Sequence, residues 1–360
     1  MNIDKAGRNS RSVKEERELS QVSYRAFLLR LRKLAEKALE SYGFEQVRLR
    51  FVNYSGNGLY QVSIPSGSSA NSRKYALRLH QPNYMKPKYI SSEMEWLSAL
   101  NQAGIHVPEP IPNLNGEWLT VVEGEFDMPR ERTCTLLGWT EGRLLKKSIR
   151  PKHLESLGRV VGRMHRQSRS WKKPDGFARP HWDWEGLYGN GFDYGFSVVA
   201  AREAIPKAHQ YVFNEVLEQV REASEQLGKG RSVYGLIHAD LSLGDNIAFF
   251  GGEARPFDFD DCGFGYWVFD LGVTLAHYMS DFSGISPNMR DALIAGYGEM
   301  VNLEGNSQEY LDLFIAARYA QLMLFYQGGA LRYPQHREEA IREVNSHANE
   351  LKRILKRMPK

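Results

Sequence analysis

Apolar residues in the first third of the chain alternate between helical and strand spacing. From Ser20 to Tyr42 they recur with a helical period, and Gly43 favours an end to that helix. The stretch 47–64 predicts two strands joined at a glycine turn, and 74–80 predicts a third. The composition of residues 65–74 predicts a loop. Further predictions are a helix at 91–103, an extended link with three prolines at 105–112, and strands at 118–122 and 134–139.

After Gly142 the pattern becomes mainly helical. Helices are expected at 154–168, 204–227, 267–279, 289–300 and 308–327, with a final one near the end of the chain. A single strand-rich island, 236–259, interrupts them. A small β-rich part followed by a larger helical part predicts a two-lobed α+β protein. We expect a disordered tail over 1–19, an N-terminal lobe over 20–135 and a C-terminal lobe over 136–360.

Composition narrows the class of protein. The chain has 360 residues, of which 42% are hydrophobic and 25% charged, as in a soluble globular protein with room for two lobes. The sequence shows neither a run of about 18 apolar residues nor the apolar stretch of a secretory signal. Cys134 and Cys262 form no C-x-x-C pair, which favours a cytoplasmic setting. The net charge of +4 is mild, and neither a nucleic-acid nor a membrane partner is expected.

Candidate chemistry is concentrated in the island LIHADLSLGDNIAFFGGEARPFDFDD. An apolar strand ends at His238 and Asp240, a polar loop reaches Asn246, and a strand pair ends at Asp258. Two carboxylates and an amide are therefore delivered to one place by adjacent short elements. Phosphoryl transfer uses such a set, because one carboxylate orients the attacking hydroxyl while an amide and a second carboxylate hold Mg²⁺.

This island resembles the catalytic segment of the aminoglycoside phosphotransferase and choline kinase family, whose members are relatives of the protein kinases. The shared pattern is H-x-D, then an Asn, then a hydrophobic strand ending in Asp. The resemblance implies a bilobal protein-kinase-like fold, ATP as phosphate donor and Mg²⁺ as cofactor. It further implies that Asp240 is the catalytic base, that His238 braces its loop, and that Asn246 and Asp258 bind the metal.

The spacing of this segment departs from the kinase pattern. Five residues lie between Asp240 and Asn246, where the kinase pattern has four. Asp245 is therefore an alternative metal ligand, although Asn246 is preferred because it directly precedes the strand. Asp260 could face the metal or solvent. Asp270 opens a helical pattern and is expected to cap or brace that helix.

Nucleotide binding is expected in the N-terminal lobe. The turn Gly56-Asn57-Gly58 lets backbone N–H groups approach phosphate, although such a turn is commonly only a hairpin. Ala76 and Arg78 share one face of a strand, where the small side chain admits adenine and the guanidinium reaches phosphates. Lys74 lies on the same face and is the reserve candidate.

Two further nucleotide contacts follow from the resemblance. The family has a Glu on the next helix that pairs with the phosphate-binding base, and Glu93 is preferred over Glu95 for this role. The segment around Leu136 and Leu137 resembles the family's hinge, whose backbone binds adenine.

The sequence says less about the phosphate acceptor than about the nucleotide. The stretch from Trp182 through Asp183 and Trp184 to Glu185 could hold a cationic or hydroxylated small molecule, with Asp260 nearby, or could be a packing motif. A small-molecule hydroxyl is the expected acceptor, and a protein hydroxyl the less favoured one.

Other functions fit the sequence less well. The sequence lacks G-x-S-x-G and G-x-x-x-x-G-K-[ST], which argues against a serine hydrolase and a P-loop NTPase. The D-x-D at 258–260 also occurs in glycosyltransferases and phosphatases, but the early clustering of strands does not suit their folds. A nucleotide-binding pseudokinase acting as a scaffold is the main rival. Arg78 and the long loop permit it, whereas intact Asp240 and Asp258 argue against it.

Overall fold

The computed structural model describes residues 23–65, 73–124, 131–145, 148–282, 287–303 and 308–358. The tail predicted over 1–19 and most of the loop predicted over 65–74 lie outside these residues. The chain forms two compact units. One comprises the chain up to Ser98 together with Pro108–Trp139, and the other comprises Ala99–Val107 together with the chain from Thr140 onward.

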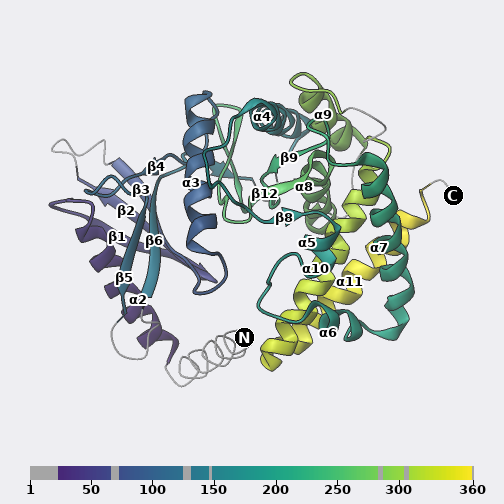
Figure 1. Ribbon diagram of the computed structural model, residues 1–360, viewed down its shortest axis with the longest axis horizontal. Coiled ribbons are helices and arrows are strands. Elements are labelled where there is room, and N and C mark those ends of the chain that lie inside the picture. The colour runs from purple at the N-terminus through teal and green to yellow at the C-terminus, as the bar shows by residue number, and fades with distance from the viewer. Residues whose placement is uncertain are drawn as a thin grey trace. The chain divides into compact units, whose positions relative to one another are not determined.

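The first unit is built on a six-stranded antiparallel sheet, shown in purple and blue in Figure 1. Its order is β1-β2-β3-β6-β4, and β5 pairs with the same edge of β6 as β4 does. The strands are β1 (Arg48–Ser55), β2 (Asn57–Ile64), β3 (Arg73–Leu79), β4 (Pro110–Ile111), β5 (Leu119–Glu123) and β6 (Glu131–Gly138). The strands expected from alternation are all present, and β4 adds a short pairing within the proline link.

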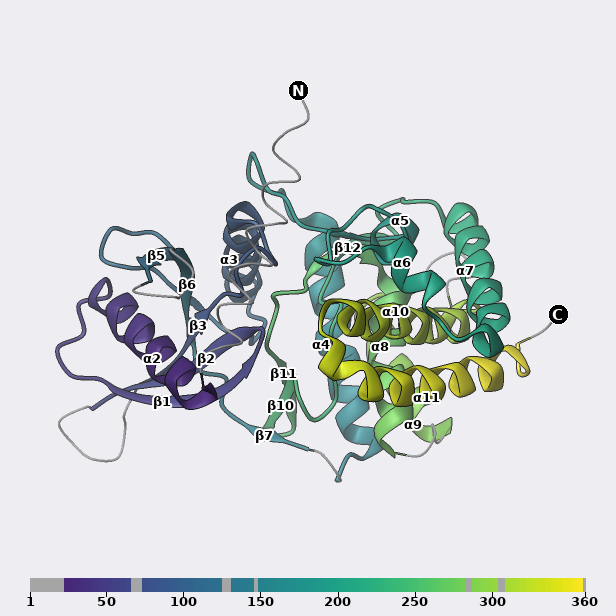
Figure 2. The same cartoon turned by 90° about the horizontal axis from the view of Figure 1, so that it is seen from below.

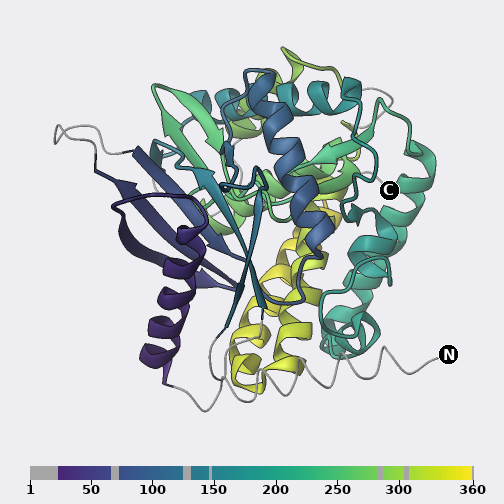
Figure 3. The same cartoon turned by 60° about the vertical axis from the view of Figure 1, so that its left-hand side comes forward.

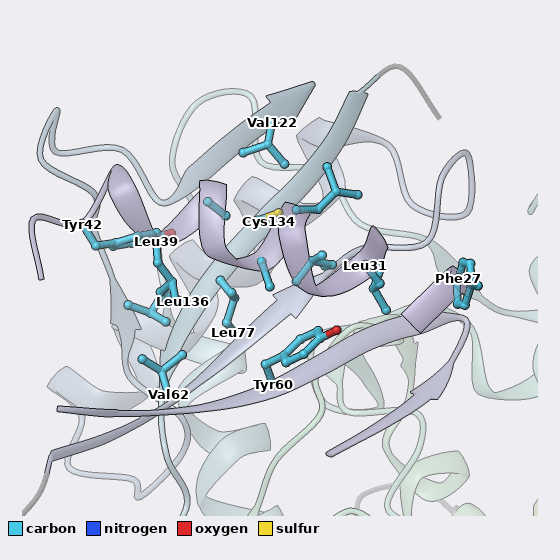
Figure 4. Close-up of a cluster of buried hydrophobic side chains, with 14 residues drawn as sticks. Phe27, Leu31, Leu39, Tyr42, Tyr60, Val62, Leu77, Val122, Cys134 and Leu136 are labelled. Carbon is cyan, nitrogen blue, oxygen red and sulfur yellow. The ribbon is translucent and has the colours of Figure 1, made fainter. Parts of the chain in front are cut away.

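Helix α2 (Tyr24–Glu40) covers one face of this sheet, as Figure 3 shows for the purple helix. Its N-terminus is capped by Ser23, whose Oγ accepts from the N–H of Ala26 at 3.3 Å. Its buried residues recur with the helical period and pack on the sheet. Figure 4 shows this core, in which Leu31 and Leu39 of the helix face Leu77 and Tyr60 of the strands.

Helix α3 (Pro87–Gln102) begins four residues before its predicted start. Pro87 occupies its first position, where the missing N–H costs nothing. The buried Glu93 lies on this helix.

The second unit is mainly helical. Its helices are α4 (Pro151–Ser170), α5 (Trp184–Tyr188), α6 (Val198–Glu203), α7 (Lys207–Leu227), α8 (Trp267–Phe282), α9 (Pro287–Gly298), α10 (Leu311–Arg332) and α11 (Arg337–Leu355), with a 3₁₀ turn at Pro334–His336. Helix α4 packs against α9, and α10 packs against both α8 and α11 (Figure 2). The central position of α10 explains why most of its residues are buried.

The second unit also contains two three-stranded sheets. One has the order β11-β10-β7, and the other β8-β12-β9. Their strands are β7 (Arg143–Leu144), β8 (His181–Trp182), β9 (Tyr234–Ile237), β10 (Ile247–Phe250), β11 (Glu253–Pro256) and β12 (Gly263–Tyr266). The predicted island 236–259 therefore spans the end of β9 and the whole hairpin of β10 and β11.

The helix predicted over 204–227 begins three residues later than expected and ends where predicted, at Leu227, while the short α6 before it was not predicted. Helix α6 ends at Glu203, and α7 begins at Lys207, directly after Pro206. Proline lacks the N–H that a continuous helix needs and disfavours helical backbone in the residue before it. Among the described residues, no helix is both long and apolar enough to span a membrane.

Candidate active site

The segment predicted to be catalytic begins at His238, directly after β9, and its backbone is strained. Ala239 has φ +67° and Asp258 has φ +66°, a region that residues other than glycine seldom occupy. Such conformations persist only where surrounding contacts enforce them. One of these residues, Ala239, directly precedes the predicted base, and the other, Asp258, is a predicted metal ligand.

His238 links three parts of this segment. Its ring is fully buried, and Nδ1 accepts from the N–H of Asp240 at 3.3 Å. Nε2 lies 3.1 Å from the main-chain oxygen of Phe257, so the network assigns the proton to Nε2. The ring also packs against Phe259, with a centroid distance of 4.3 Å. His238 thus ties the loop of Asp240 to the segment that carries Asp258.

Asp270, in the first turn of α8, holds the same segment through its carboxylate. Its Oδ1 accepts from the N–H of Ala239 at 2.7 Å, and its Oδ2 accepts from the N–H of His238 at 3.0 Å. Oδ2 also lies 3.1 Å from Nε2 of His165, whose Nδ1 lies 3.0 Å from the Tyr297 hydroxyl. The bracing role expected for Asp270 is therefore directed at the catalytic loop rather than at its own helix.

Both carboxylate oxygens of Asp240 receive hydrogen bonds. Asn246 Nδ2 donates to Oδ2 at 2.7 Å and to the main-chain oxygen of the same residue at 3.0 Å. Ser242 Oγ donates to Oδ1 at 3.1 Å, and Arg318 Nη2 donates to it at 2.6 Å. Burial favours the neutral acid, but the charge of Arg318 holds the pKa of Asp240 below its ordinary value. Asp240 is accordingly an ionised carboxylate in a fixed orientation.

The predicted metal ligands lie at one end of the hairpin of β10 and β11. The two strands pair from Ile247 with Pro256, and the N–H of Phe257 donates to the oxygen of Asn246 at 2.9 Å. Asn246 directly precedes β10 and Asp258 comes two residues after β11, so both lie at the same end of the hairpin. Because Nδ2 of Asn246 is committed to Asp240, its Oδ1 is the atom left to meet a cation. Asp245, the alternative, is exposed, whereas Asn246 is 9% exposed.

The donor set fits Mg²⁺ only with help from a substrate. Among the described residues, no three His, Cys, Asp or Glu side chains converge on one point. One amide and one or two carboxylates are too few for a complete octahedral shell, but Mg²⁺ in phosphoryl-transfer sites is normally completed by water and nucleotide phosphates.

Both tryptophans of the stretch considered for the acceptor make hydrogen bonds within the protein. Trp182 is 2% exposed, and its Nε1 donates to the main-chain oxygen of Asp261 at 2.7 Å. Trp184 Nε1 donates to the oxygen of Leu217 on α7 at 3.1 Å. Both tryptophans therefore use their polar atoms within the protein.

Asp183 in the same stretch caps α5. Its Oδ1 accepts from the N–H of Gly186 at 3.0 Å, and its Oδ2 lies 2.6 Å from Lys229 Nζ. Burial opposes ionisation, but the bond to Lys229 leaves the pKa of Asp183 below its ordinary value. Glu185 is exposed in the first turn of α5. The geometry favours the packing interpretation of Trp182, Asp183 and Trp184 over direct acceptor contact.

The loop that carries Asp260 is held by a residue that sequence reasoning missed. Arg179 is 3% exposed, and its guanidinium donates to the main-chain oxygens of Asp260 and Cys262. Asp260 is half-buried. Arg179 and Trp182 together fix the turn that follows Asp258.

In the first unit, Arg78 and Glu93 form a buried ion pair. Arg78 Nη1 lies 2.7 Å from Glu93 Oε1, and the side chains are 5% and 1% exposed. The structure thus pairs the predicted phosphate-binding base with Glu93 rather than with Glu95. For Glu95, the other candidate, burial raises the pKa of the carboxyl group. Ala76, two residues before Arg78, pairs with Gln61 of β2 and Leu137 of β6, while the reserve candidate Lys74 is exposed.

The glycine turn between β1 and β2 has packing reasons of its own. Gly56 has φ +84°, and an added Cβ would lie 2.4 Å from Oε1 of Gln81. Asn57 Oδ1 accepts from the N–H of the same Gln81 at 2.9 Å. A Cβ on Gly58 would lie 2.8 Å from a methyl group of Leu31. These contacts account for the turn residues without a nucleotide, and their predicted phosphate contact stays a prediction.

The predicted adenine contact at Leu136 and Leu137 meets a physical objection. These residues lie inside β6, paired with β3 on one side and with β4 on the other. Their main-chain groups therefore serve the two ladders. The chain leaves the sheet after Gly138, which places any free hinge backbone later than predicted.

Comparisons with known proteins agree with this geometry. Residues 61–310 match the model of the phosphotransferase enzyme family. Amicoumacin kinase of Bacillus subtilis (strain 168) is 29% identical over 256 residues, which cover 67% of this chain and 66% of that protein, slightly under two thirds of its length.

Two solved structures are similar over most of their length. The microcompartment-associated aminopropanol kinase has a TM-score of 0.73 and 27% identity, covering 89% of this chain and 94% of that chain. An amicoumacin kinase in complex with AMP-PNP, Ca²⁺ and Ami has a TM-score of 0.71 and 20% identity, covering 93% and 96%. These likenesses confirm the predicted bilobal kinase-like α+β fold.

The family match spans well over half of the chain and contains the whole catalytic segment from His238 to Asp258, as the H-x-D pattern indicated. The prediction of an ATP-dependent phosphotransferase is confirmed at the level of the family, and the pseudokinase alternative receives no support. The chain belongs to the phosphotransferase enzyme family that also contains aminoglycoside and choline kinases.

Proposed function

We propose that this protein transfers the γ-phosphate of ATP to a hydroxyl group of a small molecule, with Mg²⁺ as cofactor. The observation that carries this proposal is the arrangement around Asp240. An ionised carboxylate is held by Asn246 through one amide atom, while the other amide atom is left to meet a cation. A scaffold that only binds nucleotide has no need of such a base.

In the proposed reaction, the acceptor oxygen attacks the γ-phosphorus and forms the new P–O bond. The bond to the β-phosphate oxygen breaks, and its electron pair leaves with ADP. Asp240 orients the acceptor hydroxyl and takes its proton. Asn246 and Asp258, or Asp245 in place of the amide, would hold Mg²⁺, which neutralises phosphate charge when bound. Arg78, held by Glu93, would bind phosphate oxygens.

The acceptor class follows from the relatives. One similar structure is an aminopropanol kinase and another is an amicoumacin kinase bound to AMP-PNP and Ca²⁺. We infer that the acceptor is an amino alcohol or a hydroxylated amino compound, and that the donor is ATP with a divalent cation. A protein hydroxyl remains the less favoured acceptor. The cytoplasm is the proposed location, and 20–135 and 136–360 are the proposed nucleotide and catalytic lobes.

The test is ATP consumption with a panel of acceptors: 1-amino-2-propanol, ethanolamine, choline, spectinomycin, amicoumacin and a generic protein substrate. We expect turnover with at least one small molecule. Asp240→Asn should lower kcat at least about a hundredfold, since general base catalysis contributes that much, with little change in the affinity for AMP-PNP. Absence of turnover across the panel despite nucleotide binding would contradict the proposal, and unchanged kcat in Asp240→Asn would contradict the role of Asp240.

A further inference from the structure

A buried arginine from a distant helix contacts the proposed base. Arg318 lies in the middle of α10 and is 8% exposed. Its Nη2 donates to Asp240 Oδ1 at 2.6 Å, and its Nη1 donates to Gln321 Oε1 at 2.8 Å. The two ends of the guanidinium are thus anchored at once, one on the catalytic loop and one on its own helix. The contact joins residues 78 positions apart.

Packing alone does not explain an arginine at this position. Taking a guanidinium and a carboxylate out of water costs more than an apolar pair of similar volume, so a buried ion pair is weak evidence for stability. Arg318 Nε, moreover, is buried and has no hydrogen-bond partner among the described residues. The neighbours of Arg318 on α10 are largely apolar, and the helix would pack at least as well with an apolar side chain here.

The catalytic loop itself offers no cation beside Asp240. The five residues from Leu241 to Asp245 contain neither lysine nor arginine. His277 reaches the same place, since its Nε2 lies 3.1 Å from Ser242 Oγ and 3.8 Å from Asp240 Oδ1. Burial and the charge of Arg318 lower the pKa of His277 to about 4, so this histidine is neutral at pH 7. Arg318 is therefore the group that carries permanent positive charge against the carboxylate.

Three donors, one on Oδ2 and two on Oδ1, fix the plane of the carboxylate. Asn246 approaches Oδ2, while Arg318 and Ser242 approach Oδ1. A carboxylate held only by Asn246 and Ser242, both attached to the same loop, would move with that loop. Arg318 anchors it instead to α10, which packs against α8 and α11 in the centre of the unit (Figure 2).

We propose that Arg318 is a positioning residue for phosphoryl transfer, which holds the Asp240 carboxylate in the orientation that accepts the hydroxyl proton. The inference rests on the proposed function and deepens it. Arg318 acts through Asp240 and takes no proton itself, because guanidinium stays protonated at all relevant pH values. Its removal lowers the rate of the chemical step and leaves nucleotide binding intact.

The experiment compares Arg318→Met and Arg318→Lys with wild type, using 1-amino-2-propanol or whichever member of the panel the wild type turns over fastest. Arg318→Met is expected to lower kcat about a hundredfold, the scale of a displaced reacting group, with a smaller change in the KM for ATP and unchanged affinity for AMP-PNP. Arg318→Lys keeps the positive charge but lacks the forked guanidinium, and it should recover part of the lost kcat. Arg290→Met is the matched control, because it removes another Arg–Asp pair of the same unit, with Asp312, and should keep the wild-type kcat.

A double variant separates positioning from a general structural role. If Arg318 acts through Asp240, then Arg318→Met causes no further loss of kcat in an Asp240→Asn background. Thermal unfolding of each variant shows which variants are folded. If Arg318→Met does not fold, Arg318→Lys takes its place in the comparison. Wild-type kcat in a folded Arg318 variant, or an equal loss in both backgrounds, overturns the inference alone. A wild type without turnover on the whole panel overturns the proposed function, and the inference falls with it.

Discussion

At the residue scale, two aspartates near each other in space have different surroundings and different roles. Asp270 is fully buried and accepts two main-chain N–H groups, so its carboxylate is a fixed part of the loop's architecture. The side chain of Asp240 is 25% exposed, and its partners are side chains that hold it from two sides. The Asp270 carboxylate fixes the backbone of the loop, and the Asp240 carboxylate is accessible for the proposed reaction.

The choice between Asn246 and Asp245 as metal ligand is also a question at the residue scale. Asn246→Ala should raise the Mg²⁺ concentration needed for half-maximal activity about tenfold or more, because it removes both the proposed ligand oxygen and a bond to Asp240. Asp245→Ala changes an exposed side chain and should shift that concentration far less. The measurement is a Mg²⁺ titration of activity for the two variants in parallel. A larger shift in Asp245→Ala would reassign the ligand.

At the element scale, α4 and α9 approach each other through glycines. A Cβ on Gly158 would lie 2.1 Å from the main-chain oxygen of Leu293, and one on Gly296 would lie 1.9 Å from that of Glu155. These are contacts with backbone, which cannot move aside as a flexible side chain can. Helix α4 also contributes His165, which contacts Asp270, so the helix pair supports the catalytic segment indirectly.

Gly296→Ala should therefore destabilise the protein by about 1–3 kcal/mol, the cost of overpacking, despite the better helix propensity of alanine. Gly298, two residues later in α9, has no atom within 4 Å of its added Cβ. Gly298→Ala is accordingly the matched control and should be neutral or slightly stabilising. Chemical denaturation measures both free energies of unfolding. Equal values for the two variants would show that the close approach of the helices does not matter.

At the scale of the whole molecule, buried neutral histidines make stability depend on pH. Burial lowers the pKa of His347, on α11, to about 4, against an opposing contribution from Glu343 and with a reinforcing one from Arg318. The unfolded chain binds this proton near pH 6.5 and the folded protein only near pH 4. Stability is therefore fully present above pH 6.5 and declines as pH falls toward 4.

His347→Phe should reduce this decline, by up to about 3 kcal/mol from the difference in pKa. The ring is 6% exposed, neither of its nitrogens has a hydrogen-bond partner among the described residues, and Tyr319 and Tyr326 lie against it. Phenylalanine is thus expected to fit. Urea denaturation at several values between pH 7 and pH 4 provides the comparison. Parallel curves for variant and wild type would contradict the assignment.

The sequence by itself determined the features that depend on neighbouring residues. Periodicity located most helices and the strands of the first sheet, because side-chain spacing reflects which face an element buries. It placed the start of α7 three residues before Lys207, on the wrong side of Pro206. It missed the short β8, α5 and α6, which are too brief to show a period. The segment from His238 to Asp258 was readable because its groups lie on consecutive short elements.

Only the tertiary structure decided which distant groups complete that segment. Arg318 and Arg179 stand 78 and 81 positions from the residues they hold, and nothing local marks them as different from other arginines. The choice between Glu93 and Glu95 depended on the rotation of α3 relative to β3. The partners of the ring nitrogens of Trp182 and Trp184 come from another loop and another helix, which favours packing for these residues. Contacts between segments depend on how elements pack, and spacing along one chain does not encode that by itself.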